Sequence, residues 1–270
     1  MRIFIFSLFL ALSHVSIQAN SSAFLSASFW DDGAAEVSVY TAQRYHYGRF
    51  YPAKIKYFLV KESFSQSKMV KADNNNSQDA IPVIKLNQVI STPTGTYDYQ
   101  QMHSSFWSKD SGSLLKFSMS HHEACGSSYK QGLLAADSFR IQGNTYWEGQ
   151  SVIQHTVPVH DSLWFYDELP FRLRQLLADK NAIPDHLQII PSTIHSKAGS
   201  FQPAPARAEI NGFTVTVDHA HGKDVLQFDP EWPHVMTSWQ QADGESLTLE
   251  KTLRIDYWNH HAPGDEKLLK

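Results

Sequence analysis

Apolar and polar residues alternate along much of this chain, in short segments separated by turn residues. Phe213, Val215 and Val217 alternate with Thr214 and Thr216, and the region 247–257 repeats the pattern. Such alternation places one face of a strand in a core and favours antiparallel pairing, because strands of a parallel sheet are buried on both faces. Strands are predicted at 35–41, 55–60, 81–89, 97–107, 114–121, 128–134, 138–141, 145–157, 187–194, 213–217 and 247–257, with a solvated loop at 73–79.

One segment has the periodicity of a helix instead. Its apolar residues recur at spacings of three and four; they are Leu163, Tyr166, Leu169, Leu173, Leu176 and Leu177. Proline is tolerated only in the first turn of a helix, so Pro170 predicts a helix over 170–179 after a short turn at 163–168. Asn181 and Pro184 should end it. The fold class expected is mainly β: a curved antiparallel sheet, an incomplete barrel or two sheets, with this helix against an open face or mouth.

The first nineteen residues have the composition of a secretory signal peptide. Arg2 precedes an apolar run over 3–12, and small and polar residues lead to Ala19. This order matches the charged, apolar and cleavage regions of such a peptide, whereas a membrane span needs about twenty apolar residues. We therefore expect export, to the periplasm or to the extracellular space, and no transmembrane segment in the mature chain. The expected organisation is a β half at 20–160, a helical divider at 161–182 and a β half at 183–270, with one continuous domain as the alternative.

Charge and cysteine content narrow the possible partners. The 23 Lys and Arg against 27 Asp and Glu give a net charge of −4, without a basic cluster. Neither nucleic acid nor an anionic membrane surface is an expected partner. Cys125 is the only cysteine, so an intrachain disulfide is impossible, and the thiol is expected to be buried.

Two histidine clusters are the candidates for chemistry. In a strand running through 121–125, His121, Glu123 and Cys125 would share one face, where they could bind zinc or pair a base with a nucleophile. The same face carries Leu115, Phe117 and Met119, which favours a core histidine and a buried cysteine. His219 and His221 have the spacing of two metal ligands on one strand face. Gly222, Lys223 and Asp224 read as a hairpin turn, which favours exposed loop histidines.

Common catalytic signatures are missing from the sequence. It contains no nucleophile elbow, phosphate loop, His-Glu-x-x-His or dinucleotide fingerprint, so no cofactor is expected. The best interpretation is an exported, envelope-associated binding module without catalytic activity, whose partner is a hydrophobic ligand, such as a lipid, or an envelope protein. The alternative is a metal-dependent or Cys/His hydrolase that uses His121, Glu123 and Cys125.

Several stretches resemble a family of uncharacterised bacterial exported proteins. They are Ala35-Glu36-Val37 followed by 44–48, the segment 58–64, Gly95-x-Tyr97-x-Tyr99 with Met102, Cys125-Gly126, and 166–170. Some relatives carry the name of the septum-formation inhibitor Maf, whose members resemble cytoplasmic nucleotide pyrophosphatases. That label implies a phosphate-handling α/β enzyme, which agrees with neither the predicted signal peptide nor the β pattern. The resemblance assigns no catalytic or binding residue.

Overall fold

The computed structural model describes residues 22–269, so the signal peptide predicted at 1–19 lies outside the described residues. The helices are α1 (Ala23–Ser26) and α2 (Leu169–Asp179), with 3-10 turns at Ser28–Asp31, Tyr166–Glu168, Tyr257–Asn259 and Asp265–Leu269. The strands are β1 (Ala35–His46), β2 (Arg49–Ser65), β3 (Val70–Lys71), β4 (Ala80–Pro93), β5 (Asp98–Ser108), β6 (Leu114–Glu123), β7 (Gly126–Ala135), β8 (Ser138–Asn144), β9 (Val152–Pro158), β10 (Leu163–Phe165), β11 (Gln188–Ile190), β12 (Ala204–Pro205), β13 (Arg207–Asn211), β14 (Thr214–His219), β15 (Gly222–Phe228), β16 (Met236–Gln240) and β17 (Ser246–Ile255).

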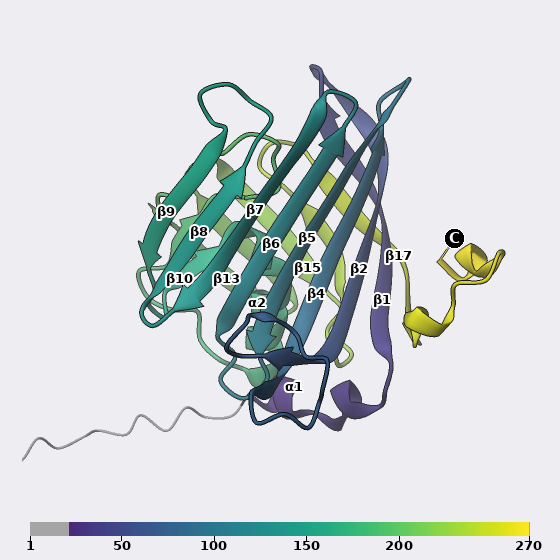
Figure 1. Cartoon of the computed structure of the whole chain (residues 1–270), viewed down its shortest axis with the longest axis vertical. Coiled ribbons are helices and arrows are strands. Elements are labelled where there is room, and N and C mark those ends of the chain that lie inside the picture. The colour runs from purple at the N-terminus through teal and green to yellow at the C-terminus, as the bar shows by residue number, and fades with distance from the viewer. Residues whose placement is uncertain (1–21, 270) are drawn as a thin grey trace, which may run out of the picture.

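Nearly all of these strands belong to one curved antiparallel sheet (Figure 1). Its order is β13-β14-β15-β16-β17-β1-β2-β4-β5-β6-β7-β8-β9, with β3 beside β2. Pairing of β1 with β17 joins the first and last parts of the chain into a single sheet. The two end strands, β9 and β13, are not paired with each other in the described structure, so the sheet curls without closing. The predicted curved antiparallel sheet is confirmed.

The main core lies on the concave side of the sheet, where α2 and a small second sheet are packed. Helix α2 is joined to β5 by the ring of Phe171, which stacks on fully buried Trp107 with centroids 3.9 Å apart. Phe171 also meets Phe24 of α1 edge to face, at 5.9 Å. Stacked aromatic pairs add about 0.5–1.5 kcal/mol beyond the area they bury. The helix therefore fills the lower end of the curve (Figure 1).

The helix begins and ends close to the predicted residues. Pro170 occupies its first turn, and Lys180 follows its end in the left-handed conformation at φ 53°. The predicted turn at 163–168 is shorter, because Leu163–Phe165 forms β10, which pairs in parallel with β11. All three side chains of β10 are buried, so Leu163, which fits the helical spacing, also fits a short, fully buried strand.

Two predicted strands are wrong in extent. Residues 145–151 form a loop before β9, and the predicted strand at 187–194 is reduced to Gln188–Ile190, after which Pro191 begins an irregular segment. The solvated loop predicted at 73–79 is confirmed. No helix within residues 22–269 is long and apolar enough to cross a membrane.

Candidate functional site

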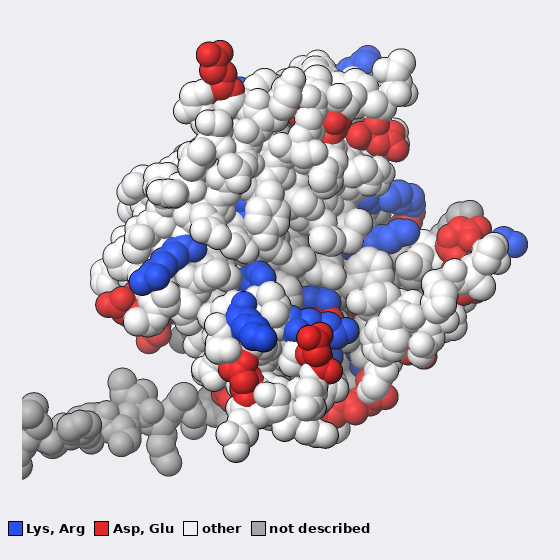
Figure 2. Space-filling model, in the orientation of Figure 1, with Lys and Arg blue, Asp and Glu red and all other residues white. Residues whose placement is uncertain are grey.

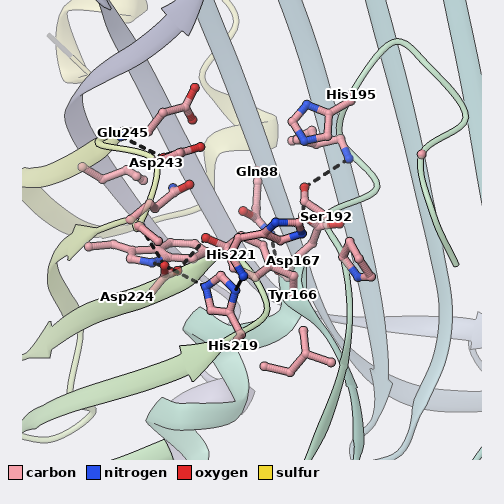
Figure 3. A pocket seen from close by; sticks show the side chains of 18 of the residues that line it. Gln88, Tyr166, Asp167, Ser192, His195, His219, His221, Asp224, Asp243 and Glu245 are labelled. Atoms are coloured by element: carbon pink, nitrogen blue, oxygen red, sulfur yellow. Dashed lines mark hydrogen bonds and ion pairs between the residues drawn. The ribbon is translucent and has the colours of Figure 1, made fainter. Parts of the chain in front are cut away.

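A cavity of about 500 Å³ lies on the concave side of the sheet, between β1, β2 and β4, the irregular segment after β11, and the turns of the last hairpins (Figure 3). Its residues are Arg44, Ile55, Tyr57, Gln88, Ile90, Tyr166, Asp167, Ile189, Pro191, Ser192, Ile194, His195, Gly199, Ser200, Ala204, His219, Ala220, His221, Asp224, Trp239, Gln241, Ala242, Asp243, Glu245 and Leu247. Pockets of this size hold small ligands in many proteins. The lining combines aliphatic side chains with polar and charged ones.

One wall is the segment 191–200, which runs along the inner face of β5–β7 without strand pairing. Side chains of the sheet donate to its backbone carbonyls. Gln101 Nε2 lies 2.9 Å from the oxygen of Ile194, and Ser128 Oγ lies 2.6 Å from that of Ser196. Lys130 Nζ donates to the carbonyls of Thr193 and His195, both at 2.8 Å. Buried backbone groups need such partners, so the polar inward residues of β5–β7 hold this wall in place.

Lys130, which holds this wall, makes the stability of the protein depend on pH. The side chain is fully buried, and burial lowers its pKa to about 8. A folded-state pKa below the unfolded value means that the unfolded chain binds more protons between pH 8 and 10.5, so this lysine's contribution to stability rises over that interval. Between pH 7 and 9.5, the wild type should gain about 2 kcal/mol in free energy of unfolding relative to Lys130→Met. Urea denaturation at both pH values measures this difference, and parallel pH dependences of the two proteins would contradict it.

The lower end of the cavity is formed around Asp167. Its carboxylate accepts hydrogen bonds from Ser192 Oγ at 2.6 Å and from the backbone N–H and Oγ1 of Thr193, both at 2.7 Å. Its carbonyl accepts from Gln88 Nε2 at 2.7 Å. Burial raises the pKa of Asp167, but the nearby His103 and these hydrogen bonds outweigh that effect and hold the pKa below its usual value. Asp167 therefore fixes the start of the segment 191–200 to the 3-10 turn before α2.

A second buried carboxylate, Asp224, organises the wall made by the last hairpins. It accepts from Tyr166 Oη at 2.5 Å, Trp239 Nε1 at 2.8 Å, the backbone N–H of Ala242 at 2.9 Å and His219 Nε2 at 3.0 Å. Burial raises its pKa, but the hydrogen bonds from His219 and Tyr166 and the others outweigh that effect, so that the net pKa lies below the ordinary value. Asp224 is thus an ionised acceptor joining β15, β16 and the turn before α2.

The mouth of the cavity carries an ion pair between Arg44 and Glu245. Arg44 is 7% exposed, and its Nε has no hydrogen-bond partner among the described residues. Burial raises the pKa of Glu245 despite the guanidinium beside it. Asp243 and His195 lie at the same end, and both are exposed. Figure 3 shows Glu245 and His195 above the cluster formed by Gln88, Tyr166 and Asp167, one to each side. The cavity thus offers aliphatic side chains and, at its mouth, groups that can donate and accept hydrogen bonds.

The first predicted cluster is divided by the structure. Strand β6 ends at Glu123, and Cys125 lies in the turn before β7, where it is exposed. The expectations of a buried thiol and of a strand through 121–125 are therefore wrong, because the hairpin turns at Ala124 and Cys125. His121 is buried; its Nδ1 accepts from Gln101 at 3.0 Å, and its Nε2 lies 3.4 Å from Glu123 Oε1. Burial lowers the pKa of His121 in spite of that carboxylate.

The second predicted pair lies at the cavity. His219 is half-buried and bonded to Asp224, and exposed His221 follows in the turn, with the two ring centroids 6.0 Å apart. The predicted turn at 222–224 is wrong, since Gly222 already begins β15 and pairs with His219. Of the two histidines, only His221 is exposed in a loop, as the sequence pattern favours for both. Within residues 22–269, no three His, Cys, Asp or Glu side chains are grouped as a metal site requires.

Sequence reasoning missed Asp224, Asp167, Arg44 and Glu245 as residues of one site. Arg44 is more than a hundred residues from the other three in the chain, and the pairing of β1 with β17 brings it beside Glu245. For Asp224 a signal exists: Asp224, Leu226 and Phe228 alternate, and all three are buried. An acidic residue in register with an apolar face indicates an inward carboxylate.

Comparison with known proteins adds no function. No family model matches the chain, and no curated protein matches it. Among solved structures, the chain is similar to a β-barrel-like protein of the domain of unknown function DUF1849 from Brucella abortus, at 8% sequence identity and a TM-score of 0.46. The match covers 82% of this chain and 97% of that one.

Proposed function

We propose that this protein is an exported binding module without catalytic activity, and that it holds an amphipathic ligand with a single alkyl chain in the cavity. The observation that carries the proposal is the cavity of about 500 Å³, whose lining combines aliphatic side chains with polar and charged ones. Export, with the periplasm as the destination, rests on the composition of residues 1–19.

The composition of the lining favours an alkyl chain. Five aliphatic side chains line the cavity together with the polar cluster at Asp167 and the ion pair of Arg44 and Glu245; they are Ile55, Ile90, Ile189, Ile194 and Leu247. Burial of an alkyl chain there would yield about 0.8 kcal/mol for each CH₂ group. The unpartnered Nε of Arg44 supplies a donor for an oxygen of the ligand's polar end. A fatty acid or a lysophospholipid has this chemistry.

Filling the cavity tests the proposal directly. Ile90 faces the cavity, and its neighbour Val89 lies on the opposite face of the same strand. A dansyl-labelled fatty acid should bind the wild type and be displaced by unlabelled fatty acid or lysophosphatidylcholine. Ile90→Trp should weaken binding at least about tenfold, or about 1.4 kcal/mol, because the indole occupies the space of the alkyl chain.

The matched control is Val89→Trp, which adds the same ring to the convex face and should leave probe binding unchanged. Circular dichroism and the thermal midpoint establish that both variants are folded. Equal binding by the two folded variants would place the probe outside the cavity and refute the proposal, as would failure of the wild type to bind.

A further inference from the structure

Exposed aromatic side chains gather at the end of the sheet where the cavity opens. Tyr47 lies in the turn between β1 and β2 and is 63% exposed, and Tyr146 lies in the loop between β8 and β9 and is 60% exposed. We define the aromatic rim as these two residues together with Tyr45, Phe50, Tyr97 and Trp147. A group of large aromatic residues exposed on a protein surface often marks an interaction site.

Contacts between the turns show that the rim adjoins the cavity wall. The ring of Phe50 lies against Gly244, in the turn that also carries the cavity residues Asp243 and Glu245. Tyr45 packs edge to face on Phe50, with centroids 5.2 Å apart. The rim thus meets the cavity wall at the turn between β16 and β17.

The remaining rim residues continue around the same end. Tyr47 Oη is hydrogen-bonded to Tyr97 Oη, and it lies 2.6 Å from Tyr99 Oη. Tyr146 packs over Gly126 of the next hairpin. Trp147 Nε1 donates to Ser196 Oγ at 3.2 Å, within the segment that forms a cavity wall. The six rim residues therefore come from three hairpin ends, and they contact two more, at Gly126 and Gly244, and the segment 191–200.

Charge around the rim is sparse and of both signs. The turns that carry it contain Arg49, Asp98, Glu148 and Asp243, and Lys197 lies over the Trp147 ring at 5.1 Å. In Figure 2 the upper part of the visible face carries a few separate acidic and basic groups on a mostly uncharged surface, and more Lys, Arg, Asp and Glu lie lower down. A surface of this kind lacks the cluster of basic residues that draws proteins to anionic lipids.

We propose that the aromatic rim docks on the interface of a phospholipid bilayer with zwitterionic headgroups, with the cavity mouth facing the lipid. Tyr and Trp suit this depth, because the ring is apolar and the polar end reaches water or headgroups. The inference rests on the proposed function, since a ligand with an alkyl chain would then pass between bilayer and cavity without crossing water. The charge balance at the rim favours a neutral surface.

Sedimentation with sucrose-loaded phosphatidylcholine vesicles tests the docking. The wild type should sediment with the vesicles, and the variant Tyr47→Ser/Tyr146→Ser should lose at least about tenfold in partition coefficient. The matched control is Trp258→Ser/Phe213→Ser, which removes two exposed aromatic residues, 46% and 37% exposed, away from the rim. This control should sediment as the wild type does.

Vesicle docking and ligand binding can be tested independently of each other. The rim variant should still bind the dansyl fatty acid in solution, and Ile90→Trp should still sediment with vesicles while losing the probe. Docking is refuted if the wild type stays in the supernatant, if it sediments only when phosphatidylserine is added, or if the rim variant and the control sediment alike. In the first case a protein partner becomes the explanation for the rim.

Discussion

Replacing Arg174 by Met should lower the free energy of unfolding by about 3–5 kcal/mol, because the change leaves the carboxylate of Glu36 buried without its partner. The two side chains are 6% and 4% exposed and form a bidentate pair, with both N–O distances at 2.7 Å. Arg174 also donates to the carbonyl of Pro233 and lies over the rings of Phe24 and Trp30. Urea denaturation at pH 7 measures the loss.

A double variant separates the ion pair from the packing around it. In Arg174→Met/Glu36→Leu neither charge remains, so most of the lost stability should return. Lys54→Met is the surface control, since Lys54 and Glu250 pair with side chains 54% and 36% exposed, and it should cost less than about 1 kcal/mol. If the double variant were as unstable as Arg174→Met, the stabilisation would come from the stem of Arg174 and its stacking on aromatic rings rather than from the charges.

The strands and the helix could be predicted because their signals are local. Alternation at Val215 and Val217 and the position of Pro170 in a first turn act within a few residues, and both are confirmed. Phe213 is the exception, since it precedes β14 and is 37% exposed. The segment 191–200 has no such signal. Its shape depends on Gln101 and Lys130, which lie more than sixty residues away in the chain.

Prediction of the candidate site from the sequence is also limited by strand register. A shift of one or two residues in the position of a turn decides whether a side chain faces the core or solvent. The turn at Ala124 and Cys125 exposes a thiol that alternation would place inside. The turn at Ala220 and His221 does the reverse and brings Asp224 into the wall of the cavity.

Because Asp224 lies buried in this wall, its replacement is the second change expected to have a large effect on stability. Asp224→Ala should lower the free energy of unfolding by about 3–5 kcal/mol, since Tyr166, Trp239 and the amide of Ala242 lose a buried charged acceptor, and each unsatisfied group costs about 1–3 kcal/mol. Binding of the dansyl fatty acid should weaken as well, because these groups shape one side of the cavity. Asp243→Ala removes a single local bond, to the amide of Glu245, and should cost less than about 1 kcal/mol.

The dependence of this effect on pH identifies the charge as its source. The pKa of Asp224 is lower in the folded protein than its ordinary value, so the unfolded chain takes up the proton first as the pH falls. The stability that the carboxylate contributes is present above about pH 4 and is lost as the pH falls through the folded-state value. Asp224→Asn lacks this titration, so its deficit relative to the wild type should narrow between pH 5 and 3 in urea denaturation. A constant deficit over that range would mean that the shape of the side chain matters at this position and its charge does not.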